Sequence, residues 1–238
     1  MKRALVTGGS GVIGSAICLL LADRGFDVLV HANSREERAR ALAKQIVDAG
    51  GAAEAISFDV SDRAHCASIL SALAESQPIQ VVIHNAGIHD DAPLAGMSGE
   101  QWDSVINVSL NGFFNVVRPL LLPMISTRWG RIISMASVAA VVGSRGQANY
   151  AAAKSGLHGA SKALAVELGS RGITANVVAP GIIESEMASA FKPEQIMQMV
   201  PMKRAGRPEE VAAVVGFLAS AEASYVSGQV IGVNGAMI

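Results

Sequence analysis

Two side chains that can move a proton lie four residues apart in the segment QANYAAAKSG. Tyr150 and Lys154 occupy positions i and i+4 of an expected helix, so both side chains lie on one face. An ammonium at that distance lowers the pKa of a phenol, which brings the tyrosine into range as a general acid. Ser137, at the end of an apolar run, can meet them across a cleft. These residue types indicate proton donation to a polarised carbonyl oxygen.

A glycine-rich segment near the N-terminus, ALVTGGSGVIGSAI, indicates the cofactor. Gly9, Gly11 and Gly14 fit the pattern G-x-G-x-x-G, in which a tight turn brings a dinucleotide pyrophosphate to a helix N-terminus. The pattern alone is weak, because glycine turns also arise for geometric reasons. Its position between the first apolar strand and a helix that begins near Val12 makes it specific. We therefore expect a dinucleotide-binding turn.

The end of the second expected strand, HANSR, favours NADPH over NADH. Readers of NAD place a carboxylate there to bind the ribose 2′-hydroxyl, and this segment has none. Asn33 and Ser34 can donate hydrogen bonds to a 2′-phosphate, and Arg35 can form an ion pair with it. The alternative for Arg35 is a solvated residue in the first turn of the charged helix SREERARAL.

Short apolar runs alternate with helical patterns along the whole chain, which predicts an α/β fold with right-handed crossovers and a parallel sheet. The fold is expected to be a single-domain, doubly wound Rossmann-type sheet of seven strands, with its ligand at the carboxyl ends of the strands. The strand candidates are RALVT, DVLVH, AEAISF, QVVIH, GRIISMA, ITANVVA and GQVIGV. Helices are expected at about 11–24, 35–49, 62–76, 98–126, 148–169 and 207–220.

Composition limits the classes of function. The 238 residues are 50% hydrophobic and 16% charged with a formal net charge of −1, which suits one domain over 1–238 and offers no basic surface for nucleic acid. The apolar run after Lys2 and Arg3 is broken at once by glycines, so we expect neither a signal peptide nor a membrane span, and a cytoplasmic protein. Cys18 and Cys66 lack metal-ligand spacing, so we expect core cysteines and no metal site.

Further motifs resemble those of the short-chain dehydrogenase/reductases. Besides Ser137, Tyr150 and Lys154, these are HNAG at 84–87, VAPG at 178–181 and YVSGQVIGVNGAM at 225–237, in the family's order and spacing. The resemblance covers essentially the whole chain. Within the family the chain is most similar to the 3-oxoacyl-[acyl-carrier-protein] reductases, through QANYAAAKSG, RGITANVVAPG and SGQVIGVNG.

The resemblance implies NADPH-dependent reduction of a 3-oxoacyl thioester, carried by acyl carrier protein, in fatty-acid or related polyketide or polyene synthesis. Tyr150 would be the general acid, Ser137 would polarise the carbonyl oxygen, and Lys154 would lower the tyrosine pKa and hold the nicotinamide ribose. The implied cofactor-binding residues are Gly8, Ser10, Gly11, Ile13, Gly14, Asn33, Ser34, Arg35, Asp59, Val60, Asn85, Ala86, Gly87, Tyr150, Lys154, Pro180, Gly181, Ile183 and Ser185.

Three positions depart from the family pattern. The compact reductases usually write the glycine turn as T-G-x-x-x-G-x-G, which would place glycine at Val12. His84 stands where the family usually has asparagine. In NVSLNGFF, Ser109 is in register with the family's fourth catalytic residue, an asparagine that helps to hold a water of the proton relay, while Asn107 and Asn111 point elsewhere on a helix.

The segment 182–206 is irregular and rich in methionine, and we expect it to be a substrate lid in which Met187, Phe191, Met197 and Met199 face an acyl chain. Ordinary packing or an oligomer contact is the alternative. Arg128 and Arg171 match two arginines that bind the acidic carrier protein in the resembled reductases, although a solvated turn and a helix C-terminus would explain them too. The resemblance also implies a homotetramer built from the helices 98–126 and 148–169 and the C-terminal strand.

Other activities stay open at this stage. A dehydrogenase of a free alcohol, steroid or sugar, or an acetoacetyl-CoA reductase, would use the same catalytic residues, because fold and triad fix the reaction type and not the substrate. The Ser109 departure also allows a non-catalytic NADPH-binding subunit of a hetero-oligomer.

Overall fold

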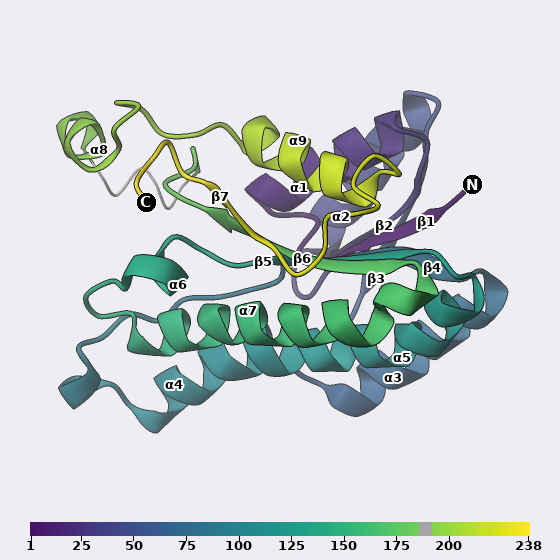
Figure 1. Cartoon of the computed structure of the whole chain (residues 1–238), viewed down its shortest axis with the longest axis horizontal. Coiled ribbons are helices and arrows are strands. Elements are labelled where there is room, and N and C mark those ends of the chain that lie inside the picture. Colours follow the sequence, from purple (N-terminus) through teal and green to yellow (C-terminus); the bar gives the residue numbers. More distant parts are fainter. Residues whose placement is uncertain (186–191) are drawn as a thin grey trace.

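A seven-stranded, all-parallel sheet forms the centre of the computed structural model, which describes residues 1–185 and 192–238 (Figure 1). The strand order is β3-β2-β1-β4-β5-β6-β7, so the direction of winding reverses between β1 and β4. This confirms the doubly wound Rossmann-type sheet expected from the sequence. The strands are β1 (Arg3–Val6), β2 (Asp27–Ala32), β3 (Ala52–Ser57), β4 (Ile79–His84), β5 (Gly130–Met135), β6 (Ile173–Pro180) and β7 (Val230–Val233).

Helices cover both faces of the sheet (Figure 1). One layer contains α1 (Val12–Asp23), α2 (Glu36–Asp48) and α9 (Pro208–Ala219). The other layer contains α3 (Arg63–Ser76), α4 (Gly99–Ile106), α5 (Gly112–Ser126) and α7 (Ala148–Leu168). Shorter elements are the 3-10 turns η1 (Leu94–Gly96) and η3 (Gly169–Arg171), the π turn η2 (Asn107–Asn111), α6 (Ala139–Val142) and α8 (Pro193–Met199).

Alternation along the strands divides the core between the two layers. Ala4 and Val6 of β1 pack with α1 and α9 in one apolar cluster, while Leu5 packs with α3 and α5 in another. Because both faces of the sheet are covered, the strands are nearly continuous apolar runs. The side chains of β1 therefore pack against the helices of both layers. The polar residues at the ends of the strands lie outside these apolar clusters and are available to form a site.

Local signals in the sequence define most helix boundaries. Asp62 caps α3 by accepting a hydrogen bond from the His65 backbone N–H at 3.0 Å. Ser98 and Gln101 form a reciprocal capping box at the start of α4. Pro208 occupies the first turn of α9, where its missing N–H removes no helical bond. These boundaries lie close to those expected from the sequence.

The structure corrects the expected helix 98–126. It is split into α4 and α5 by the π turn η2, in which the Gly112 N–H donates to the Asn107 carbonyl. A glycine suits this place because a Cβ on residue 112 would come within 3.0 Å of the Val60 side chain. The turn thus inserts one extra residue where the helix passes the end of the sheet.

Among the described residues, one helical run is long and apolar enough to cross a membrane by length and composition, Gly99–Ser126. Of its apolar window, 44% is buried inside the molecule. The core helix of a soluble protein passes the same test, so this finding is weak evidence for a membrane span.

Candidate active site

The turn between β1 and α1 is shaped by glycines that leave no room for side chains. Gly8 has a φ of +62°, and a Cβ there would lie 3.0 Å from the Asn85 side chain. A Cβ on Gly14 would collide with the Gly8 carbonyl oxygen. The α1 N-terminus carries no side-chain cap, so its first N–H groups stay available to an anion. The turn therefore fits a dinucleotide pyrophosphate.

Side chains from two neighbouring strands hold this turn. The Asn85 amide donates to the carbonyls of Thr7 and Gly8 at 3.0 and 3.1 Å, and the Thr7 hydroxyl accepts from the backbone N–H groups of Asn85 and Ala86 at 2.9 and 3.0 Å. The Gly8 N–H donates to Nδ1 of His31 at 3.1 Å, and Nε2 of His31 bonds to the Phe58 carbonyl at 2.8 Å. The turn is thus fixed to the ends of β2 and β4.

The structure brings the three expected catalytic residues to the carboxyl ends of β5 and β6. Ser137 follows β5, and Tyr150 and Lys154 lie in the first two turns of α7. A cavity of about 130 Å³ joins Tyr150 and Lys154 to Ile13, Asn85 and Gly87 from the cofactor side and to Pro180 from the end of β6. The candidate acid therefore faces the same space as the candidate cofactor residues.

The protonation states suit a proton donor. Burial raises the pKa of Tyr150; the hydrogen bond from Ser137 lowers it and the charge of Asp91 raises it. Burial lowers the pKa of Lys154 to about 8. The Lys154 ammonium donates to the Met135 carbonyl at 2.9 Å and lies 5.8 Å from the centre of the Tyr150 ring. In this arrangement Tyr150 stays protonated, whereas the sequence led us to expect a phenol whose pKa Lys154 lowers.

A hydrogen-bond network positions the start of α7. Asn149, fully buried, donates to the carbonyls of Asp90 and Gln101 at 2.9 and 3.0 Å, and its own oxygen accepts from the Tyr150 N–H at 2.8 Å. Gln147 donates to the Asp91 carboxylate at 2.8 Å. Sequence reasoning missed this network and the bonds of His31. A clue was present, since polar residues at the carboxyl end of a strand and at a helix start are placed to bond locally.

The expected nucleotide-binding residues lie at the ends of β2, β3 and β6. Asn33, Ser34 and Arg35 are exposed directly after β2, where their side chains are open to a ligand. The Asp59 carboxylate accepts from the backbone and hydroxyl of Ser61 at 2.8 and 2.7 Å, which fixes it after β3. Pro180 ends β6, and Gly181, Ile183 and Ser185 lie in the loop that follows it. Ser10 and Gly11 lie in the turn before α1, and Val60 lies in the turn after β3.

Ser109 is fully buried in η2, whereas Asn107 and Asn111 are exposed and bond to each other at 2.7 Å. The asparagines thus point away from the site, as expected. A Cβ built on Gly87 would lie 2.9 Å from the Lys154 ammonium nitrogen and 3.4 Å from the Ser109 hydroxyl. Ser109 therefore shares a small space with Lys154.

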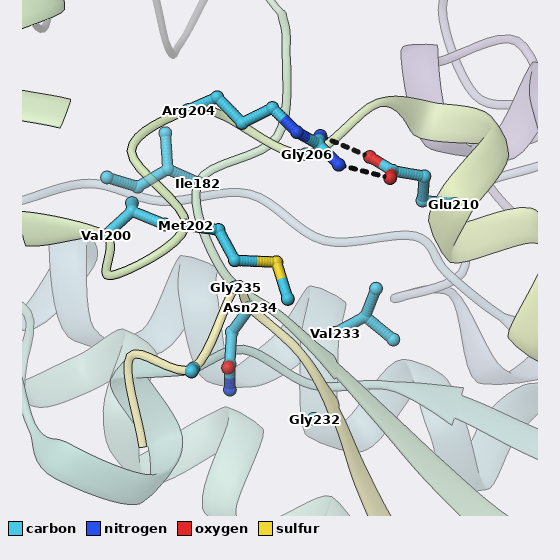
Figure 2. A pocket seen from close by; sticks show the side chains of 11 residues that line it. Ile182, Val200, Met202, Arg204, Gly206, Glu210, Gly232, Val233, Asn234 and Gly235 are labelled. Atoms are coloured by element: carbon cyan, nitrogen blue, oxygen red, sulfur yellow. Dashed lines mark hydrogen bonds and ion pairs between the residues drawn. The ribbon is translucent and has the colours of Figure 1, made fainter. Parts of the chain in front are cut away.

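A second and larger cavity, of about 290 Å³, lies beside the cleft (Figure 2). Ile182, Val200 and Met202 supply apolar walls, and the end of β7 supplies Asn234. A two-pronged ion pair between Arg204 and Glu210, both oxygens at 2.7 Å, stands at its side. Among the expected lid residues, Met197 and Met199 are half exposed on α8 and line neither cavity, while Met187 and Phe191 lie outside the described residues.

Arg128 and Arg171 lie together, but not at the cleft of their own chain. The Arg128 guanidinium donates to the Ser170 carbonyl at 3.2 Å. Arg128 precedes β5 and Arg171 precedes β6, and in a parallel sheet residues before the strands lie at the edge opposite to residues after them. Both arginines are thus separated from Tyr150 by the length of the sheet, which corrects the expectation of a charged rim on this cleft.

Among the described residues, no three His, Cys, Asp or Glu side chains gather as metal ligands would. Cys18 and Cys66 are buried free thiols, and burial raises the pKa of both. The candidate reactive groups of the site are the Ser137 hydroxyl, the Tyr150 phenol and the Lys154 ammonium.

The fold and these groups define an oxidoreductase that uses a nicotinamide cofactor. The chain belongs to the short-chain dehydrogenase/reductase family: the family model described as Enoyl-(Acyl carrier protein) reductase matches residues 9–237. Among curated relatives, the chain is 45% identical to a 3-oxoacyl-[acyl-carrier-protein] reductase FabG of Aggregatibacter actinomycetemcomitans, with 99% of both chains covered. Proteins of the same name match at 43% identity in Escherichia coli K12, covering 99% of this chain and 97% of the relative, and at 41% in Staphylococcus aureus Mu50, covering 99% and 98%. The family resemblance is confirmed.

Proposed function

We propose that this protein reduces a 3-oxoacyl thioester, carried by acyl carrier protein, to the 3-hydroxyacyl thioester with NADPH in the cytosol. The observation that carries the proposal is the shared cavity of Tyr150, Lys154 and the glycine-turn residue Ile13, in a chain whose relatives carry the name of this activity. NADPH, when bound, supplies the hydride. The side chains of the site would bind the cofactor, stabilise the carbonyl oxygen and donate the proton.

Tyr150 is the general acid of this proposal. Burial keeps its phenol protonated, so a proton is available for the oxygen of the substrate carbonyl as the hydride reaches its carbon. Ser137 donates a hydrogen bond to the same oxygen and stabilises its developing charge. Lys154 would hold the nicotinamide ribose with its buried ammonium, and the Ser109 hydroxyl borders the same small space beside Gly87 as that ammonium.

NADPH is the proposed nucleotide because residues 31–35 contain no carboxylate, and Asn33, Ser34 and Arg35 are exposed there. Glu36 and Glu37 begin α2 directly afterwards. A 2′-phosphate at the end of β2 would therefore lie next to the hydrogen-bond donors of Asn33 and Ser34 and the guanidinium of Arg35, and the first carboxylates come only after them in the chain.

A homotetramer is part of the proposal. Phe114 and Leu122 on α5 and Val166 on α7 are 47%, 78% and 87% exposed, which is costly for apolar side chains unless a partner covers them. A second copy packed against this face with α7 antiparallel would bring the end that carries Arg171 to the partner's Tyr150 end. The arginine pair would then serve the neighbouring cleft and could bind an acidic carrier protein there.

The test measures NADPH oxidation with an acetoacetyl thioester, a crotonyl thioester and a free ketone, each repeated with NADH. We expect the acetoacetyl thioester with NADPH to be turned over at least about tenfold faster than the others, a difference of ~1.4 kcal/mol. A faster crotonyl thioester would instead favour the enoyl reduction named by the family description. Preference for the free ketone would contradict the substrate class, and bound NADPH without turnover of any substrate would indicate a non-catalytic subunit.

Tyr150→Phe tests the mechanism. Loss of the phenolic proton should lower kcat by roughly 10²-fold or more. NADPH binding, followed by nucleotide fluorescence, should persist, because the ring itself is retained. Near-normal turnover in this variant would remove Tyr150 from the role of general acid.

A further inference from the structure

His84, the last residue of β4, is a buried titratable side chain that the reaction described above does not use. It is fully buried, and its Nε2 lies 2.8 Å from the main-chain oxygen of Ser109. A carbonyl can only accept, so Nε2 carries the proton and donates it, which fixes the tautomer. The ring also packs edge-on against Phe113, with 5.6 Å between ring centres. His84 is thus held in one orientation toward η2.

The acceptor of this bond belongs to the π turn. In η2 the Gly112 N–H reaches back to Asn107, one residue further than in an α-helix. Such turns are rare and less regular than α-helix, and they persist where surrounding structure supports them. The bond from His84 reaches η2 from the end of the central sheet. It therefore ties the irregular turn to the central sheet.

The side chain of the same residue lies beside the catalytic lysine. A Cβ on Gly87 would come within 3.4 Å of the Ser109 hydroxyl and 2.9 Å of the Lys154 ammonium nitrogen, so both groups border one small space. The Ser109 hydroxyl is buried, and among the described residues it has no hydrogen-bond partner. The Ser109 hydroxyl can therefore form a hydrogen bond with a group that enters this space, next to the Lys154 ammonium.

The imidazole itself is neutral. Burial, and then the nearby Lys154 ammonium, lower the pKa of His84 to about 3. His84 therefore acts as a hydrogen-bond donor at any pH at which the protein works. It adds no second positive charge behind Lys154.

We propose that His84 is a positioning residue: its Nε2–H holds the Ser109 peptide in the π turn and thereby keeps the Ser109 hydroxyl beside the Lys154 ammonium. This inference rests on the proposed function for its effect on turnover. The effect of Ser109 on the Lys154 ammonium can be tested without it.

Two substitutions separate the hydrogen bond from the packing of the ring. His84→Gln places an amide nitrogen near the position of Nε2 and can still donate to Ser109. His84→Phe keeps a flat aromatic ring of similar shape, larger by one ring atom, but removes the donor. We expect His84→Phe to lower kcat at least about tenfold with an unchanged Kd for NADPH, and His84→Gln to recover kcat to within about threefold. His65→Phe and His65→Gln, on the exposed face of α3, are the matched controls and should leave kcat unchanged.

A measurement on Lys154 is independent of the substrate. NMR of labelled lysine side chains follows the titration of the Lys154 amine near pH 8. If the serine hydroxyl supports the ammonium, His84→Phe should lower the Lys154 pKa by about half a unit or more, and His84→Gln should not. An unchanged titration in His84→Phe, or equal shifts in both variants, would overturn the positioning role. If the wild-type protein reduced no thioester, the proposed function would fail while this measurement still decided the inference.

Discussion

The Lys154 ammonium donates to the Met135 carbonyl at 2.9 Å, at the end of β5, and is 3% exposed. The hydrogen bond stabilises the charge only in part, since burial lowers the pKa of Lys154 from 10.5 to about 8. The site therefore contains an ammonium whose charged form is destabilised by burial in the folded protein. Active sites commonly contain such destabilising groups because the reaction requires them.

Lys154→Met should therefore stabilise the protein while it abolishes turnover. A pKa difference of this size corresponds to ~3 kcal/mol between charged and neutral forms, and methionine removes the buried charge while it fills similar space. Below pH 8 the folded and unfolded states both hold the proton, so the full penalty is present. Between about pH 8 and 10.5 the folded state loses the proton first and the penalty declines. Urea unfolding at pH 7 and pH 10 should thus show a gain for the variant that shrinks at the higher pH. A less stable variant at pH 7 would contradict this account.

Tyr150 should titrate above the ordinary value of a tyrosine in the protein without cofactor. The chain has two tyrosines, and Tyr225 is fully exposed, so Tyr225→Phe leaves a protein in which ultraviolet absorbance reports Tyr150 alone. In that background Asp91→Asn should lower the Tyr150 pKa, because the carboxylate raises it. Asp23→Asn, exposed at the end of α1, is the control and should leave the titration in place. If Tyr150 titrated below pH 10 without cofactor, burial would not be the dominant cause.

Much of the fold follows from local features of the sequence. The apolar strands, the caps at Asp62 and Ser98 and the first-turn Pro208 predicted element positions to within a few residues, because each of these signals acts through its nearest neighbours. The grouping of Ser137, Tyr150 and Lys154 near a glycine turn also followed from spacing together with the rule that parallel strands present their carboxyl ends at one edge.

The π turn and the polar network could not be predicted in the same way. Whether residues 107–111 form an α-helix or a π turn depends on the Gly112–Val60 contact and on the bond from His84, both made by residues distant in sequence. The orientation of the Lys154 ammonium likewise depends on the Met135 carbonyl of β5. Such choices are made by tertiary contacts, so no local pattern contains them.

Gly14→Ala should weaken nucleotide binding. The added Cβ would collide with the Gly8 carbonyl oxygen, so the turn or the start of α1 must shift, and the N–H groups that face the pyrophosphate shift with it. Gly99→Ala is the matched control, because nothing lies within 4 Å of a Cβ built at that exposed helix position. NADPH fluorescence should show at least about a tenfold weaker Kd for the first variant, ~1.4 kcal/mol, and no change for the second. Equal binding by both would place the nucleotide elsewhere.

The apolar cavity beside the cleft predicts a response to acyl chain length. Ile182 in its wall is two residues from Pro180 in the cleft, so the two spaces lie near each other and we expect a longer chain to reach from one toward the other. Lengthening the thioester from four to eight carbons should raise kcat/KM, with each buried methylene contributing up to ~0.8 kcal/mol. Met202→Asp should remove this gain and spare the four-carbon substrate, whereas Val47→Asp, at an exposed position of α2, should leave both the gain and the four-carbon activity unchanged. A flat response to chain length in the wild-type protein would assign the cavity and the methionine-rich segment to packing.

The final prediction concerns Arg128 and Arg171, which lie at the edge of the sheet opposite to Tyr150 in their own chain. If they serve the cleft of a neighbouring copy, reversing both to glutamate should raise KM for a carrier-protein thioester at least tenfold, on the order of 1.4 kcal/mol. The same acyl group on a small pantetheine mimic should be little affected, because it lacks the acidic surface that the arginines attract. Reversal of Arg24 and Lys44, exposed in the other helix layer, should not change either KM.

Mixed assemblies then show which cleft the arginines serve. Where an arginine-reversed subunit has a Tyr150→Phe subunit as its neighbour, the working cleft belongs to the reversed chain, and the neighbour retains both arginines. A low KM for the carrier-protein thioester should return in these assemblies if the arginines act across the interface between copies of α7. A KM that stays high would mean that each chain's arginines act on its own substrate path, and equal losses on both substrates in the reversed homomer would show that they support the fold instead.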